Sequence, residues 1–214
     1  MNTHFTGVVA PIDRADVDTD VILPKQFLRS VQNVGFGDFL FDGWRYLEPG
    51  KLEAPNKCRT ANPDFVLNMP RYRKAEILLC RRNFGSGSSR EHAVWALRDF
   101  GIRALIAPSF GDVFYMNCLK NGLLSIVLPE LTVARLFSDS TAVPGYQLEI
   151  DLNRQMVRVP EGTQFNFEID AFRKRCMIEG IDEVSYALNF SHLILDFETR
   201  RRLEAPWLFS ALKR

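Results

Sequence analysis

The segment that decides the fold lies near the middle of the chain. Residues 76–107 read EILLCRRNFGSGSSREHAVWALRDFGIRALIA. Ile77–Cys80 is a continuous apolar run of strand length, and Ile102–Ala107 is a second one. Between them, apolar residues recur at helical spacing and predict a helix from Ser88 to Phe100. The order strand, helix, strand predicts parallel strands that are joined by a right-handed crossover.

The same alternation continues toward the C-terminus for one further unit. Asp112–Lys120 is predicted to be a helix, because Asn121 and Gly122 follow it as a stop signal. Leu124–Leu128 is the next apolar strand, and a short helix is predicted after Pro129, up to about Phe137. These elements indicate an α/β fold with a parallel central sheet.

The last third of the sequence changes character. Alternating apolar and polar residues predict a set of antiparallel strands, with turns at 153–154 and 161–162, over Tyr146–Leu152, Met156–Val159 and Phe165–Ile169. From Ala171 onward the pattern is helical, with breaks near Gly180 and Asn189. The sequence therefore predicts an antiparallel strand set followed by a helical C-terminal tail over about residues 170–214.

The N-terminal third is less regular. Phe5–Ala10 is predicted to be a strand, and the loop Pro11–Asp20 that follows it is rich in carboxylates. Residues from about 30 to 70 place aromatic side chains among glycines and prolines, which indicates an irregular insertion over the core. Because many exposed rings would be a liability on a lone monomer, we expect these rings to form a partner interface.

Length and composition exclude several classes of protein. The chain has 214 residues, of which 46% are hydrophobic and 25% are charged, so we expect one domain over residues 1–214. A net charge of +1 gives no reason to expect nucleic acid or an anionic membrane as a partner. No apolar run approaches the roughly 18 residues of a membrane span. The N-terminal residues do not resemble a signal peptide, so a cytoplasmic location is expected.

The cysteines are irregularly spaced along the chain. They stand at Cys58, Cys80, Cys118 and Cys176, without any pair separated by two residues. This spacing predicts neither a disulfide framework nor a self-contained metal site. We therefore expect no metal ligands in this chain.

The most informative loop is Asn83–Ala93, between a buried strand and a helix. In open α/β sheets, ligands bind beyond the carboxyl ends of the strands. Gly85 and Gly87 would let the backbone approach a ligand closely, and the start of the helix would favour a carboxylate. A phosphate loop, a dinucleotide fingerprint and a hydrolase nucleophile elbow all fail to match this segment.

A structural explanation of the loop is also open. Ser88-Ser-Arg-Glu91 has the spacing of a capping box, in which Ser88 caps the helix and Glu91 reaches back to the N–H of Ser88. This pattern accounts for one serine and one glutamate. It does not account for two glycines, a second serine and Arg90 in the same turn, so the loop is either a cap, a ligand site or both.

At these residues the sequence resembles the swivelling domain of the aconitase superfamily, whose motif is present as Gly85-Ser-Gly-Ser-Ser-Arg-Glu-His-Ala93. A second segment, Asp18-Thr-Asp-Val-Ile-Leu-Pro24, is similar to the small subunits of isopropylmalate isomerases. The resemblance extends over nearly the whole chain. One departure is Ser86, since many members have cysteine there. The resemblance implies a β/β/α swivelling-domain fold.

The resemblance also implies a reaction and a partner. Members of this family interconvert 2-isopropylmalate and 3-isopropylmalate through isopropylmaleate, a step of leucine biosynthesis. In the superfamily a [4Fe-4S] cluster acts on the leaving hydroxyl and a serine accepts the carbon-bound proton. Because cysteine thiolates hold such clusters and this chain offers no cluster frame, the cluster is expected on a large subunit. The substrate is then a small dicarboxylate.

Site residues follow from the matched motifs. The resemblance implies that Ser88 is the catalytic base, and N–H donors at a helix start could stabilise its alkoxide. Arg90 matches the arginine that binds a substrate carboxylate, beside Gly87 and Ser89 in the same turn. Asp20 matches an active-site aspartate that would orient Ser88 or a histidine of the partner. Alternatively, the aspartates of this loop form a turn that bonds its own backbone.

Substrate choice is predicted to depend on residues 25–34. Phe27 and Leu28 would suit an isopropyl group, whereas Arg29 would suit a third carboxylate. Alternative functions are therefore a small subunit of a homoaconitase or a citramalate isomerase. A non-catalytic anion-binding module is a further alternative, from a different class.

Overall fold

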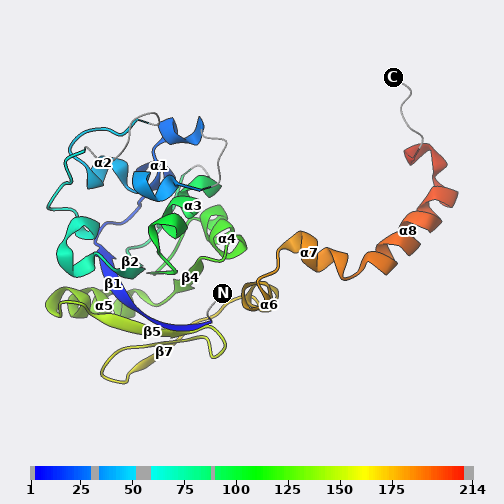
Figure 1. The fold of residues 1–214 in the computed structure, drawn as a ribbon. Helices are drawn as coiled ribbons and strands as arrows, with labels where there is room; N and C mark the ends of the chain where they lie inside the picture. Colours follow the sequence, from blue (N-terminus) through cyan, green and yellow to red (C-terminus); the bar gives the residue numbers. More distant parts are fainter. Residues whose placement is uncertain (1–2, 30–33, 52–58, 88–89, 210–214) are drawn as a thin grey trace.

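The computed structural model describes residues 3–29, 34–51, 59–87 and 90–209. Its centre is one seven-stranded sheet, in the order β4-β3-β2-β1-β5-β6-β7 (Figure 1). The strands are β1 (His4–Ile12), β2 (Ala75–Cys80), β3 (Ala104–Ala107), β4 (Leu124–Val127), β5 (Gln147–Asp151), β6 (Met156–Arg158) and β7 (Gln164–Asn166). The predicted mixed α/β class is confirmed.

The sheet has a parallel half and an antiparallel half, as the sequence predicted. Strands β1 to β4 run parallel to one another, and β5 to β7 are antiparallel to their neighbours. The two halves meet at β1, in which Val9 is aligned with Ile77 of β2 and Phe5 with Ile150 of β5. The N-terminal strand therefore occupies the middle of the sheet.

Two apolar cores lie on the two faces of the sheet. In β2, Leu78 and Cys80 belong to one core, and Ile77 and Leu79 belong to the other, because successive side chains of a strand point to opposite faces. Helices α3 (Glu91–Phe100) and α4 (Asp112–Lys120) cover the first face. Helix α5 (Glu130–Ala142) covers the second and ends five residues beyond the predicted Phe137.

The insertion is built from short helices around its own aromatic residues. These are η2 (Phe36–Phe39), α2 (Asp42–Arg45), η4 (Val66–Asn68) and η5 (Pro70–Tyr72), and two further short helices, α1 (Thr19–Ile22) and η1 (Lys25–Arg29), precede the insertion. Phe36 and Phe41 are only 2% and 0% exposed, and Phe41 stacks on Trp44. The rings are not left exposed as the expectation of a partner interface assumed: Phe36 and Phe41 join the core beneath α3, and Phe39 and Trp44 pack against it partly buried.

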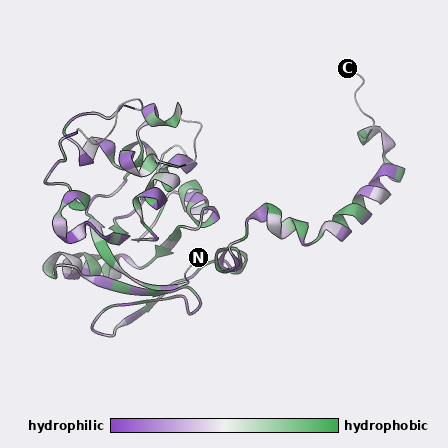
Figure 2. Cartoon of the chain, in the orientation of Figure 1, coloured by the Kyte–Doolittle hydropathy of each residue, from purple (hydrophilic) through white to green (hydrophobic). Residues whose placement is uncertain are grey.

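The C-terminal tail contains α6 (Ala171–Glu179), α7 (Glu183–Leu188), α8 (Ser191–Glu204) and η6 (Pro206–Leu208). The helices are interrupted at Gly180 and Asn189, as predicted. The only buried residue of α6 is Met177, and α7 and α8 have none. The tail extends away from the sheet (Figure 1), and its residues alternate between hydrophilic and hydrophobic along its length (Figure 2). No helix of the described residues is long and apolar enough to cross a membrane.

Candidate active site at the carboxyl ends of the parallel strands

Two loops meet at the edge of the sheet where β1 and β2 end. The backbone N–H of Gly85 donates to the carbonyl of Val17 over 2.7 Å, and that of Thr19 donates to the carbonyl of Ser86 over 3.0 Å. Parallel neighbours have their carboxyl ends at the same edge. This geometry joins two motifs that are far apart in the sequence.

Glycines at two positions shape the loop after β2. Gly85 has a φ of +76°, and a Cβ there would lie 2.2 Å from the ring of Phe114. Gly85 is therefore needed for contact with α4, rather than for the predicted approach to a ligand. Gly87 has a φ of +86°, and the nearest atom to a Cβ at this position would be Cβ of Asp18, at 3.4 Å. Gly87 is exposed and leaves the loop surface open beside the Asp18–Asp20 segment.

The two aspartates of the first motif have different roles. The Oδ1 atom of Asp18 accepts a hydrogen bond from the backbone N–H of Val21 over 2.8 Å and caps α1. This is the local turn that an aspartate-rich loop commonly forms. Asp20, in the first turn of α1, instead forms ion pairs with two cations, Arg90 and Lys25. The turn explanation therefore describes Asp18, whereas the carboxylate of Asp20 faces Arg90 across the loop.

Asp20 and Arg90 are brought together by the fold. One carboxylate oxygen of Asp20 pairs with Nη1 of Arg90, and the other lies 3.3 Å from Nζ of Lys25. The side chain of Arg90 is 19% exposed, that of Asp20 is 36% exposed and that of Lys25 is 70% exposed. Lys25 was not predicted as a site residue; its position just after the Asp18–Pro24 motif was the available signal.

The predicted base, Ser88, and its neighbour Ser89 lie outside the described residues. Arg90 directly follows them and is the N-cap residue of α3, without a capping bond from its own side chain. The helix therefore begins at Glu91, three residues later than predicted.

The predicted capping role of Glu91 is not the one observed. Its Oε1 atom accepts a hydrogen bond from Nδ2 of Asn121 over 2.7 Å. Oδ1 of Asn121 in turn accepts from Nε1 of Trp95 over 3.0 Å. The first turn of α3 is thus bound to the end of α4, because the carboxylate is directed toward that helix.

The residues predicted to select the substrate lie in and around η1. Phe27 is 0% exposed and stacks on Phe39 with ring centroids 4.1 Å apart. Leu28 is partly buried against the same core. Phe27 therefore presents no surface to a ligand in this structure, since the insertion needs its ring for packing. The side chain of Arg29 lies outside the described residues, although its backbone belongs to η1.

Metal ligation requires several donor side chains in one place. The described residues contain no group of three or more His, Cys, Asp or Glu side chains that could hold a metal ion. Burial raises the pKa of the Cys118 thiol to about 12 and raises the pKa of Cys80 well above its usual range. Because clusters are held by thiolates, these two neutral thiols do not fit an iron–sulfur centre.

Comparisons with known proteins agree with this geometry. The model of the aconitase C-terminal domain matches residues 2–131, and the LeuD_N model matches residues 134–171. The 3-isopropylmalate dehydratase small subunit of Hahella chejuensis is 57% identical over 207 residues, which covers 97% of this chain and 96% of the relative. The protein of the same name from Methylibium petroleiphilum is 56% identical over 206 residues, covering 96% and 95%.

A solved structure supports the same assignment. The 3-isopropylmalate dehydratase (LeuD) of Methanocaldococcus jannaschii superposes with a TM-score of 0.62 at 25% sequence identity. The match covers 91% of this chain and 99% of that one. Sequence relatives, family models and fold therefore converge, and the chain belongs to the family of 3-isopropylmalate dehydratase small subunits.

Proposed function

We propose that this chain is the small subunit of a two-chain hydro-lyase that interconverts 2-isopropylmalate and 3-isopropylmalate through isopropylmaleate in leucine biosynthesis. The proposal rests on one observation above all, the match over 97% of the chain to a relative with that name. The convergence of the Asp18–Pro24 and Gly85–Ala93 motifs at one edge of the sheet supports it. The substrate would be a small dicarboxylate, and neither nucleic acid nor membrane is a proposed partner.

In this proposal Arg90 binds a carboxylate of the substrate. Its guanidinium is already close to one carboxylate, that of Asp20, so the site has the charge and the donor geometry that such a group requires. A substrate carboxylate would compete with Asp20 for the same donors. Asp20 would then hold Arg90 in place before binding and orient Ser88, or a histidine of the large subunit, afterwards.

Ser88 would accept the carbon-bound proton at its Oγ atom. It follows Gly87 and stands two positions before Arg90. An alkoxide at that place would be near the N-terminal N–H groups of α3 and one guanidinium, which together favour negative charge. Gly87 and Ser89 would contribute backbone N–H groups to the same turn. The hydroxyl of the substrate then moves by one carbon through loss and return of water.

The segment η1 would select the substrate. Leu28 would contact the isopropyl group, and Phe27 would support the segment from the core. Arg29 would decide whether a substrate with a third carboxylate can also bind. A homoaconitate or citramalate substrate remains the alternative that this segment would decide.

The large subunit would supply the [4Fe-4S] cluster, which acts as a Lewis acid on the leaving hydroxyl. This division of labour agrees with the described residues of this chain, whose thiols Cys80 and Cys118 are buried and neutral. We further propose that residues 1–214 act as one swivelling domain in the cytoplasm.

The decisive experiment replaces the proposed base. Ser88→Ala, mixed with the large subunit, should assemble normally and lose turnover of isopropylmalate by about 10³-fold, since general bases contribute roughly 10²- to 10⁴-fold. Ser138→Ala makes the same chemical change on the exposed side of α5 and should keep the wild-type rate. If this chain were an anion-binding module without a catalytic role, the reconstituted pair would keep its full turnover with either variant. Parallel assays with homoaconitate and citramalate decide between the substrates.

A further inference from the structure

Most of the exposed large apolar residues among the described residues lie in the C-terminal tail. Its exposed large apolar residues are Val184, Leu188, Phe190, Leu193, Ile194, Leu195, Phe197, Leu203, Trp207, Leu208 and Phe209. Contiguous apolar surface of this kind marks an interaction site on a soluble protein. In Figure 2 hydrophobic residues recur among hydrophilic ones along the extended tail.

The apolar residues of α8 do not form a single stripe. Leu193, Ile194 and Leu195 are consecutive, and consecutive residues are separated by about 100° around a helix. Leu195 and Phe197 are therefore about 160° apart, yet both are more than half exposed, at 62% and 55%. The first two turns of α8 are thus apolar on several sides, although charged residues dominate its second half, and we expect a groove rather than a flat surface around those first turns.

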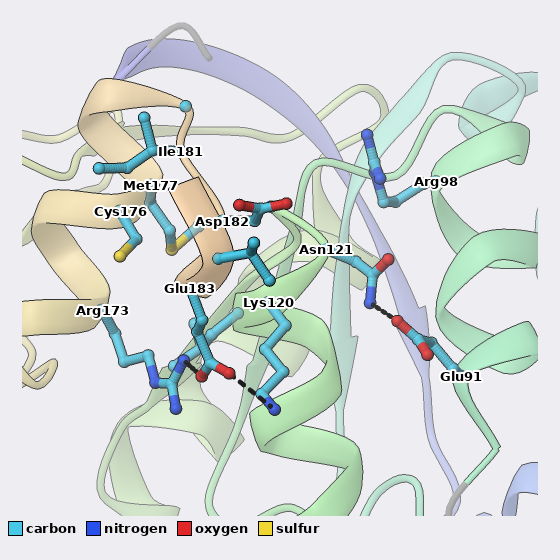
Figure 3. A pocket seen from close by; sticks show the side chains of 14 residues that line it. Glu91, Arg98, Lys120, Asn121, Arg173, Cys176, Met177, Ile181, Asp182 and Glu183 are labelled. Atoms are coloured by element: carbon cyan, nitrogen blue, oxygen red, sulfur yellow. Dashed lines mark hydrogen bonds and ion pairs between the residues drawn. The ribbon is translucent and has the colours of Figure 1, made fainter. Parts of the chain in front are cut away.

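The tail leaves the body beside the C-terminal end of α4. Glu183, at the start of α7, pairs with Arg173 of α6 and lies 3.4 Å from Nζ of Lys120 at the end of α4. These residues line a groove of about 650 Å³, which Glu91 borders on its other side (Figure 3). Glu91 is the residue after Arg90, so a chain that covers the site could also reach the tail.

A second copy of this chain does not offer a suitable receptacle in that groove. Charged residues such as Arg98, Lys120 and Asp182 line the groove at the root of the tail, and such a lining does not suit the apolar side chains of α8. We therefore expect the tail to bind a different chain, one that provides an apolar groove.

The comparisons indicate which chain this is. The family models end at residue 171, whereas the match to the Hahella small subunit spans 207 of the 214 residues and so reaches into α8. The tail is thus shared with proteins that are named small subunits, outside the part that the domain models describe. We propose that residues 183–209 form an arm that inserts into an apolar groove of the large subunit; the inference rests on the proposed function.

The test places a charge on two sides of α8 in the full-length chain. Leu195→Glu and Phe197→Glu should each weaken binding to the purified large subunit by about tenfold or more, the effect of removing an interface anchor. Leu131→Glu is the matched control, since Leu131 is 86% exposed on α5 at the opposite face of the sheet. Circular dichroism of each variant should match the wild type, because α8 has no buried residue.

Affinity and turnover are measured on the same samples. At saturating large subunit both tail variants should regain the wild-type kcat, because the arm binds without contacting substrate. Unchanged affinity would overturn the inference, and so would a loss in only one of the two variants, which would indicate a flat contact.

The isolated chain is also tested for self-association. If Leu195→Glu abolishes self-association and leaves binding to the large subunit intact, the arm binds a second copy of this chain and the inference is overturned. A wild-type pair that forms without interconverting isopropylmalates would refute the proposed function alone.

Discussion

Helices α3 and α8 are both regular helices of ten and fourteen residues, but the molecule uses them differently. In α3 the residues Ala93, Val94, Ala96 and Leu97 are buried in the first core. In α8 no residue is buried, although its sequence includes several large apolar side chains. Helical structure alone therefore does not stabilise α8 in place, because most helical stability comes from packing of an apolar face. Helix α3 is thus fixed by packing next to the candidate site, whereas the apolar side chains of α8 remain exposed.

The largest effect expected from this comparison concerns catalysis. Arg90→Ala at the start of α3 should lower kcat/KM by about 10²- to 10³-fold even at saturating large subunit, because the variant loses the charged donor that binds the substrate carboxylate. Substitutions in α8 should change affinity and leave kcat intact. Steady-state kinetics of the reconstituted pair provide the measurement.

Arg135→Ala is the control for this variant, since Arg135 lies on α5 and pairs with Asp139 of the same helix. It should have wild-type kinetics. A wild-type kcat/KM for Arg90→Ala at saturating partner would contradict the role of Arg90 in substrate binding.

The second effect concerns the stability of the isolated chain. Leu97→Ala removes a side chain that is 0% exposed and should lower the free energy of unfolding by about 2–5 kcal/mol. Leu195→Ala in α8 makes the same change at an exposed position and should alter it by less than about 0.5 kcal/mol. Urea unfolding of both variants compares the two helices directly. Equal losses would show that the tail packs on the body in solution.

The smallest effect is a pH dependence of stability. Burial raises the pKa of Cys118 from 9.0 to about 12, whereas the unfolded chain would ionise this thiol at its ordinary pKa. The neutral thiol therefore contributes full stability below about pH 9, and this contribution is lost as the pH rises toward about 12. We expect a loss of about 1 kcal/mol by about pH 10.

Unfolding at about pH 8, 9 and 10 measures this slope across the ordinary pKa of a thiol. Cys118→Ala should reduce the slope and leave the part that comes from Cys80, whose pKa burial also raises, whereas Cys176→Ala, at the partly exposed root of the tail on α6, should leave it unchanged. An undiminished slope in Cys118→Ala would assign the alkaline loss to other groups, such as Tyr146, whose pKa burial also raises to about 12.

The order of strands and helices was predictable because each apolar run has the length and period of one element. The helix Asp112–Lys120 and the tail breaks at Gly180 and Asn189 were placed correctly, since stop signals are local. The start of α3 was placed three residues too early, because the expected capping bond of Glu91 is replaced by a tertiary contact. The carboxylate of Glu91 accepts a hydrogen bond from Asn121 of α4, and no local pattern indicates that partner.

The sequence by itself determined the fold class, the family and the two motifs of the site, since those depend on residue type and spacing along the chain. Only the tertiary structure decided that Asp20 faces Arg90 and Lys25 while Asp18 caps its own helix. It also decided that the aromatic rings of the insertion lie in the core and those of the tail do not. The reason is physical: burial and ion pairing depend on which elements lie side by side, and that proximity is set by the sheet order and not by neighbours in the sequence.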